Sequence, residues 1–116
     1  MSELESRLAV YGTLAPGRSN AHILAPLKGT WRAGTVRGRL HPEGWGMTEG
    51  YPAIILDDAG DDVAVQLFES ADLPAHWPRI DDFEGDGYRR VPVAVTVSGE
   101  TLTAYIYALA TERPAS

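Results

Sequence analysis

The chain of 116 residues contains no cysteine, and this absence restricts how it can be stabilised. Disulfide bonds are excluded, and a zinc site is disfavoured because structural zinc usually depends on thiolates. No stretch approaches the about 20 consecutive apolar residues of a membrane-spanning helix, and no basic-then-apolar leader for secretion is seen. We therefore expect a cytoplasmic domain that needs no cofactor and no metal.

Basic residues are scarce relative to acidic ones. Ten lysines and arginines stand against sixteen aspartates and glutamates, which gives a formal charge of −6. Nucleic acids and anionic membranes bind basic patches, so this balance argues against both as general partners. A chain of this length buries about two-thirds of its unfolded surface as one domain. We expect a single domain over residues 1–116, with residues 110–116 as a frayed tail.

The apolar segments mostly have strand character. Every second residue from Val91 to Val97 is a valine, residues 98–100 indicate a hairpin turn, and Pro92 indicates a sheet edge or a bulge. Short helices are predicted after Asn20 and before Gly85. The pattern therefore predicts a small α+β domain whose sheet curls into a barrel. The predicted strands cover residues 7–11, 34–41, 51–58, 63–69, 89–97 and 101–109.

The acidic stretch IDDFEGDGYRR overlaps the second predicted helix, WPRIDDFEG. Pro78 suits the first turn of this helix, and Gly85 suits its C-terminal stop. At about 100° per residue, Trp77, Ile80 and Glu84 fall on one apolar face, while the aspartates between them can reach water. Glu84 is thus the carboxylate that we expect to face inward.

An inward-facing Glu84 has two interpretations. Burial, the neighbouring aspartates and the negative end of the helix dipole all raise its pKa, which suits general acid–base catalysis. Alternatively, Glu84 lies at the rim and pairs with Arg89 or Arg90 in a structural role. The spacing alone modestly favours this second interpretation.

The segment YGTLAPGRS superficially resembles a phosphate-binding P-loop, because it follows a strand and precedes a helix. Pro16 removes a backbone amide from the cradle, Arg18 replaces the lysine, and Pro26 interrupts the helix, so we reject a P-loop. A glycine turn with free amides remains, which suits a carboxylate or a carbonyl oxygen. An ordinary tight turn is the alternative. The three histidines lack metal-ligand spacing, and no nucleophile motif is present.

Four segments resemble the γ-glutamylcyclotransferase-like family, which includes γ-glutamylamine cyclotransferases and AIG2-like small bacterial homologues. These are AVYGTLAPG, YPAIILD, IDDFEGDGYRRVPVAV and AYIYAL, in that order, and the match runs from about Leu8 to Leu109. The resemblance implies a small mixed β-barrel of about six strands with short peripheral helices. It also implies a substrate cavity between the loop after the first strand and the helix that carries the glutamate.

The resemblance assigns roles to particular residues. Glu84 takes the place of the catalytic glutamate, which passes protons while a γ-glutamyl amine or peptide cyclises to 5-oxoproline and releases an amine. Arg90 matches a Tyr-x-Arg position, where a structural role is at least as plausible. No metal or nucleotide is implied. The expected substrate-binding residues are Tyr11, Gly12, Thr13, Leu14, Tyr88 and Tyr105.

Several features stay open at this level. The segment LHPEGWGMTEGYPA is longer than the usual turn of the family, so Trp45 and Met47 are candidates for shaping the side of the leaving amine. The amine itself is not specified, and neither is the oligomeric state, with a homodimer as the alternative to a monomer. The competing function is a non-catalytic module that binds a small metabolite in the same cavity. Only the enzyme requires Glu84 inside the cavity, within reach of the glycine loop.

Overall fold

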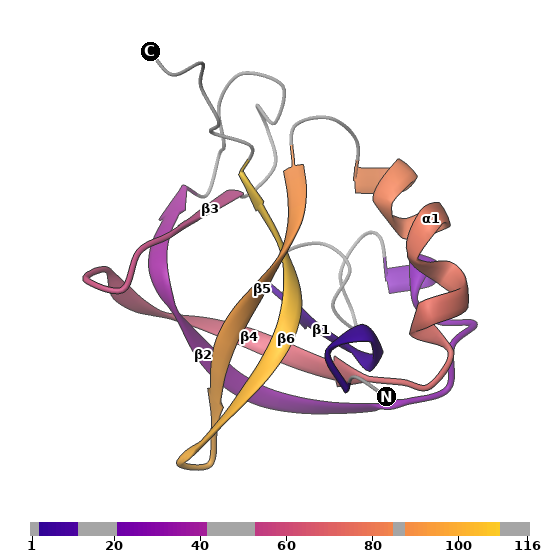
Figure 1. The fold of residues 1–116 in the computed structure, drawn as a ribbon, viewed down its shortest axis with the longest axis horizontal. Coiled ribbons are helices and arrows are strands. Elements are labelled where there is room, and N and C mark those ends of the chain that lie inside the picture. The colour runs from indigo at the N-terminus through magenta and orange to yellow at the C-terminus, as the bar shows by residue number, and fades with distance from the viewer. Residues whose placement is uncertain (1–2, 12–20, 42–52, 85–87, 110–116) are drawn as a thin grey trace.

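The strands form a small mixed barrel, seen in the computed structural model, which describes residues 3–11, 21–41, 53–84 and 88–109 (Figure 1). The strand order is β3-β2-β4-β1-β6-β5, and a further β2–β5 pairing closes five of the strands, so that β3 is an extra strand on β2. β1 and β6 run parallel, and the other pairs are antiparallel. The predicted α+β barrel of about six strands is confirmed. The strands are β1 (Arg7–Val10), β2 (Thr30–His41), β3 (Ala53–Leu56), β4 (Asp61–Glu69), β5 (Tyr88–Val97) and β6 (Glu100–Leu109).

The hairpin between β5 and β6 is confirmed, but its turn is one residue shorter than the predicted residues 98–100, because Glu100 already belongs to β6. Val97 pairs with Glu100, so the turn has two residues, Ser98 and Gly99, with φ angles of 51° and 83°. Positive φ at both positions is typical of a type I′ turn, whose twist matches that of the strands. β5 pairs with β2 at one position, Thr35 opposite Thr96, and Pro92 lies farther along β5, where a missing backbone donor is tolerated.

The helix α1 (Leu73–Glu84) starts earlier than the sequence predicts, and Pro78 lies inside it rather than in its first turn. Leu73, Trp77 and Ile80 are all buried, so the apolar stripe begins one turn before Trp77 and its packing outweighs the helix-breaking tendency of proline. At the start of the helix, the Ser70 hydroxyl accepts a hydrogen bond of 3.0 Å from the backbone amide of Asp72.

The first predicted helix is reduced to a short 3₁₀ turn, η2 (Ala21–Ile23). Leu24 and Leu27 beyond it are buried, and Pro26 between them is incompatible with a continuing α-helix. A second 3₁₀ turn, η1 (Glu3–Ser6), precedes β1 and lies beside α1 (Figure 1).

Alternation along the strands divides the core into two layers. Ala9 of β1 and Ile106 of β6 belong to the cluster shared by the barrel strands, together with Val36, Leu67 and Val95. The other face of β1 and β6 packs against α1. The buried residues of this second layer are Leu8, Val10, Leu24, Leu27, Phe68, Leu73, Trp77, Ile80 and Tyr107. The helix is therefore held against the outer wall of β1 and β6.

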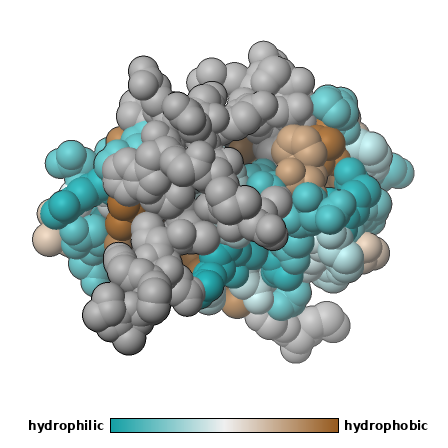
Figure 2. Space-filling model, turned by 90° about the horizontal axis from the view of Figure 1, so that it is seen from above, coloured by the Kyte–Doolittle hydropathy of each residue, from teal (hydrophilic) through white to brown (hydrophobic). Residues whose placement is uncertain are grey.

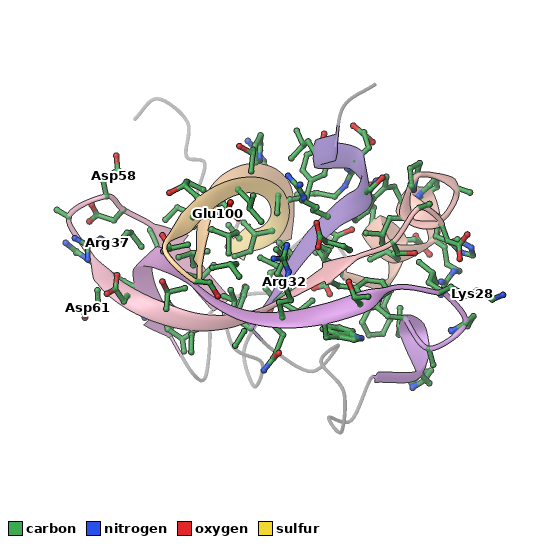
Figure 3. All side chains as sticks on the ribbon, turned by 90° about the horizontal axis from the view of Figure 1, so that it is seen from below. Lys28, Arg32, Arg37, Asp58, Asp61 and Glu100 are labelled. Carbon is green, nitrogen blue, oxygen red and sulfur yellow. The ribbon has the colours of Figure 1, made fainter. Side chains whose placement is uncertain are left out.

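The described surface is mostly hydrophilic when the molecule is seen from above (Figure 2). In the view from below, Arg37, Asp58 and Asp61 lie on the side opposite Lys28 (Figure 3). The ion pair between Arg37 and Asp62 measures 3.0 Å and is exposed, so it adds little stability. No helix in the described part of the chain is long and apolar enough to cross a membrane.

Candidate active site

Glu84 is the last described residue of α1, at the end of the barrel where β5 begins and β6 ends (Figure 1). It is half-buried, whereas Asp82 is exposed, so the helical phase predicted from the sequence is confirmed for these two residues. Burial raises the pKa of Glu84 to about 7, and the nearby negative charge of Asp81 acts in the same direction. Glu84 therefore exists both with and without its proton near neutral pH.

Asp81, one helical turn before Glu84, is bound by side chains from two strands. The Arg90 guanidinium on β5 donates two hydrogen bonds to its carboxylate, of 2.8 and 3.2 Å. The Tyr107 hydroxyl on β6 donates a third, of 2.6 Å, to Oδ1. Partial burial opposes ionisation of Asp81, but the hydrogen bonds from Arg90 and Tyr107 outweigh it and lower the pKa. Asp81 is thus a fixed negative charge, and Arg90, one of the two arginines expected as partners of Glu84, pairs with Asp81.

Arg90 is itself held between two aromatic rings. Its guanidinium carbon lies 4.3 Å from the ring centre of Trp77 and 4.4 Å from that of Tyr105. The two rings meet edge to face at 5.4 Å. Both are anchored on η1, because the Tyr105 hydroxyl donates to the Glu5 carboxylate at 3.0 Å and the Trp77 indole donates to the Glu5 carbonyl at 2.9 Å. Tyr105, expected in the cavity wall, thus packs around Arg90.

Tyr11, directly after β1, connects three parts of the barrel. Its hydroxyl donates to the Tyr107 carbonyl at 2.6 Å and accepts from the Ile54 amide at 3.2 Å. Burial raises the pKa of this hydroxyl, and nearby Tyr88 and Glu84 raise it further, so it stays neutral at pH 7. The structure thus brings together Tyr11, Tyr88 and Glu84 from the sequence-predicted set. Gly12, Thr13 and Leu14, like Trp45 and Met47, lie outside the described residues.

A sequence model of the family described as "Gamma-glutamyl cyclotransferase, AIG2-like" matches residues 8–116. The chain belongs to this family. The predicted resemblance is therefore confirmed. A search of the curated proteins found no match.

Solved structures agree in fold with this chain. An AIG2-like protein of Mus musculus superposes with a TM-score of 0.72 at 22% identity, over 95% of this chain and 80% of the mouse chain. YkqA of Bacillus subtilis gives a TM-score of 0.69 at 25% identity, over 96% of this chain but 38% of its own. An uncharacterized Pyrococcus horikoshii protein gives 0.65 at 22% identity, over 93% and 80% of the two chains.

Asp81 and Tyr107 were not predicted as site residues, and Arg90 was expected as a partner of Glu84, whereas the structure joins these three side chains to one another. Tyr107 alone reads as a core residue of a strand, and Asp81 lies at the margin of the apolar face of the helix. The available signal was the pairing of strands, because Arg90 and Tyr107 are direct partners in the β5–β6 register. Asp81 precedes Glu84 by three residues and therefore lies near it on the helix.

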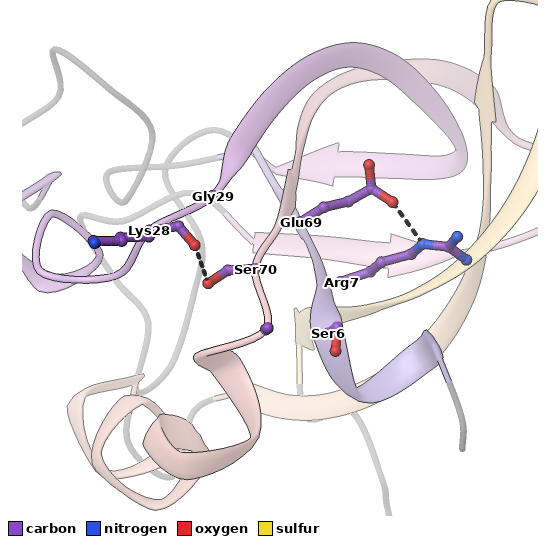
Figure 4. A pocket seen from close by; sticks show the side chains of 7 residues that line it. Ser6, Arg7, Lys28, Gly29, Glu69 and Ser70 are labelled. Atoms are coloured by element: carbon purple, nitrogen blue, oxygen red, sulfur yellow. Dashed lines mark hydrogen bonds and ion pairs between the residues drawn. The ribbon is translucent and has the colours of Figure 1, made fainter.

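A separate hollow of about 420 Å³ opens on the barrel beside η1 (Figure 4). The carboxylate in its lining is already paired, since Glu69 binds Arg7 at 2.9 Å and Arg32 at 2.8 Å. Neither Glu84 nor the tyrosines near it line this hollow, and we do not assign it to the chemistry. The lining residues are Ser6, Arg7, Lys28, Gly29, Glu69, Ser70 and Ala71.

Proposed function

We propose that this family member cleaves a γ-glutamyl amine or γ-glutamyl peptide to 5-oxoproline and a free amine, with Glu84 as general acid and base. One observation carries the proposal: a half-buried carboxyl group at the end of α1 has a pKa raised to about 7. A catalytic proton carrier is most effective when its pKa lies near the working pH, because it must both accept and return a proton.

The proton balance of the reaction matches such a group. The α-ammonium of the substrate must lose a proton to Glu84 before its nitrogen can attack the γ-carbonyl carbon. The new C–N bond closes the five-membered ring, and the bond to the leaving nitrogen then breaks. The attacking nitrogen gives up two protons in all and the leaving nitrogen gains two, so one carboxyl group can carry them in turn. Because both reacting groups belong to one molecule, the protein mainly orients the substrate.

The segment that follows Tyr11 is proposed to bind the substrate oxygens. Backbone amides from Gly12 to Leu14 would hold the α-carboxylate or the oxyanion that develops on the γ-carbonyl. Tyr11 supports this assignment, because its hydroxyl is fixed by Tyr107 and Ile54 close to Glu84. Tyr88, which interacts with Tyr11, is proposed as part of the cavity wall.

The test is a panel of γ-glutamyl amines and peptides, with release of 5-oxoproline measured by mass spectrometry. On an active substrate, Glu84→Gln should lose at least about 10²-fold in rate, because the amide matches the carboxylate in shape but accepts no proton. Asp82→Asn is the matched control, since Asp82 is exposed two residues earlier, and it should keep its activity. Full activity of Glu84→Gln contradicts the mechanism. Binding of the compounds without 5-oxoproline favours the non-catalytic binding module.

A further inference from the structure

We propose that Asp81, Arg90 and Tyr107 form a positioning set that holds the last turn of α1 against the barrel and sets the charge that Glu84 experiences. The inference rests on the proposed function, because it explains how the general acid and base is placed. None of the three is assigned contact with the substrate. Each acts through Glu84.

The hydrogen bonds to Asp81 hold the last turn of α1 in place. The Asp81 carboxylate receives three hydrogen bonds from two strands, so the turn that carries Glu84 is tied to both β5 and β6. Arg90 is fixed in turn by the rings of Trp77 and Tyr105. A planar guanidinium that binds both carboxylate oxygens restrains orientation as well as distance. The direction in which the end of α1 points is therefore set by the barrel wall.

The same residues also determine the charge near Glu84. Within residues 3–11, 21–41, 53–84 and 88–109, the titratable groups that interact with Glu84 lie on its own helix, on β6 and directly after β1, and Arg90 on β5 acts through its pairing with Asp81. Asp81 carries a negative charge, Arg90 carries the compensating positive charge, and Tyr11 and Tyr107 are neutral hydroxyls at pH 7 because burial raises the pKa of each. Tyr88 adjoins Tyr11. The balance between Asp81 and Arg90 is thus the adjustable charge beside Glu84.

Two variants should shift the titration of Glu84 in opposite directions. Asp81→Asn removes the negative charge and leaves Arg90 without its carboxylate partner, so the titration midpoint should shift downward. Arg90→Gln leaves the charge of Asp81 uncompensated, so the midpoint should shift upward. A purely structural role predicts a shift of the same sign in both variants, or none.

The measurement is an NMR titration of side-chain carboxyl carbons in the full chain without substrate. The Glu84 signal is assigned by its loss in Glu84→Gln, and Asp82→Asn is the control for removal of an exposed charge. Thermal melts establish that each variant is folded. If Arg90→Gln does not fold, Tyr107→Phe replaces it, because it keeps the ring, removes one hydrogen bond from Asp81 and should also shift the midpoint upward.

The outcomes separate this inference from the proposed function. Opposite shifts with no turnover of any γ-glutamyl compound would support the positioning set and contradict the enzyme. Turnover that depends on Glu84, combined with midpoints that are unchanged or shift together, would overturn the positioning set and leave the enzyme intact.

Discussion

At the scale of single residues, the position of Glu84 is unfavourable for folding and useful for proton transfer. A glutamate ordinarily titrates near 4.5, and burial together with Asp81 raises the pKa of Glu84 to about 7. Between these two values the folded state keeps a proton that the unfolded state has lost. Stability should therefore fall as the pH rises from about 4.5 to about 7 and stay reduced above that range.

Glu84→Gln should accordingly be more stable than the natural protein at pH 8. The amide cannot ionise, so it avoids a penalty on the order of 1 to 3 kcal/mol, which should be nearly absent at pH 4.5. Thermal or urea unfolding of both proteins at the two pH values measures the difference. Equal stability at pH 8 would mean that Glu84 is as well solvated in the folded state as in the unfolded one.

The residue scale also shows why Glu84 was predictable while its neighbours were not. Helical phase depends only on spacing along one segment, and that spacing placed Glu84 beside Trp77 and Ile80. The Arg90–Tyr107 contact depends on the register between two strands. A turn of residues 98–100, as the sequence suggested, would shift that register by one residue, whereas the observed turn contains only Ser98 and Gly99. A slip of one residue moves every side chain to the other face.

At the scale of elements, α1 shows tertiary packing overriding a local signal. Pro78 indicated a helix start, yet the helix begins at Leu73, whose side chain is fully buried. The apolar stripe formed by Leu73, Trp77 and Ile80 was present in the sequence, but the helix start was predicted too late because proline is common in the first turn of a helix. The burial of this stripe against β1 and β6 stabilises the first turn.

Leu73→Ala tests this account of the helix. Loss of a fully buried leucine side chain should cost about 2 to 5 kcal/mol of unfolding free energy. Leu40→Ala is the matched control, because Leu40 is 39% exposed and its truncation should cost less than about 1 kcal/mol. Chemical denaturation of both variants gives the comparison. Similar small losses would indicate that the first turn of α1 does not contribute to the core.

At the scale of the whole molecule, closure of the barrel brings the site residues together. Tyr11 follows β1, Arg90 lies on β5, and Tyr107 lies on β6, while the glutamate comes from a helix between β4 and β5. The individual strands and a curled sheet were predictable from alternation and turn residues. The pair of strands that closes the sheet was not, because the β2–β5 contact joins Thr35 to Thr96, 61 positions apart, and leaves no pattern in either segment alone.

Gly34 lies at this closure, and its lack of a side chain is required there. A Cβ atom at this position would lie 2.9 Å from the Thr96 carbonyl oxygen, 2.9 Å from Val97 Cγ2 and 3.0 Å from Val95 Cγ1. Two of these neighbours are buried core side chains, so they cannot move away without opening the barrel.

Gly34→Val should therefore lower the unfolding free energy by about 1 to 3 kcal/mol, because overpacking separates β2 from β5. Ala33→Val is the control: it places the same side chain at the preceding, exposed position of β2 and should be close to neutral. The loss should appear as one cooperative transition, because β5 carries both Thr96 of the closure and Arg90 of the candidate site. If Gly34→Val melts like Ala33→Val, the β2–β5 contact is not what holds the five strands together.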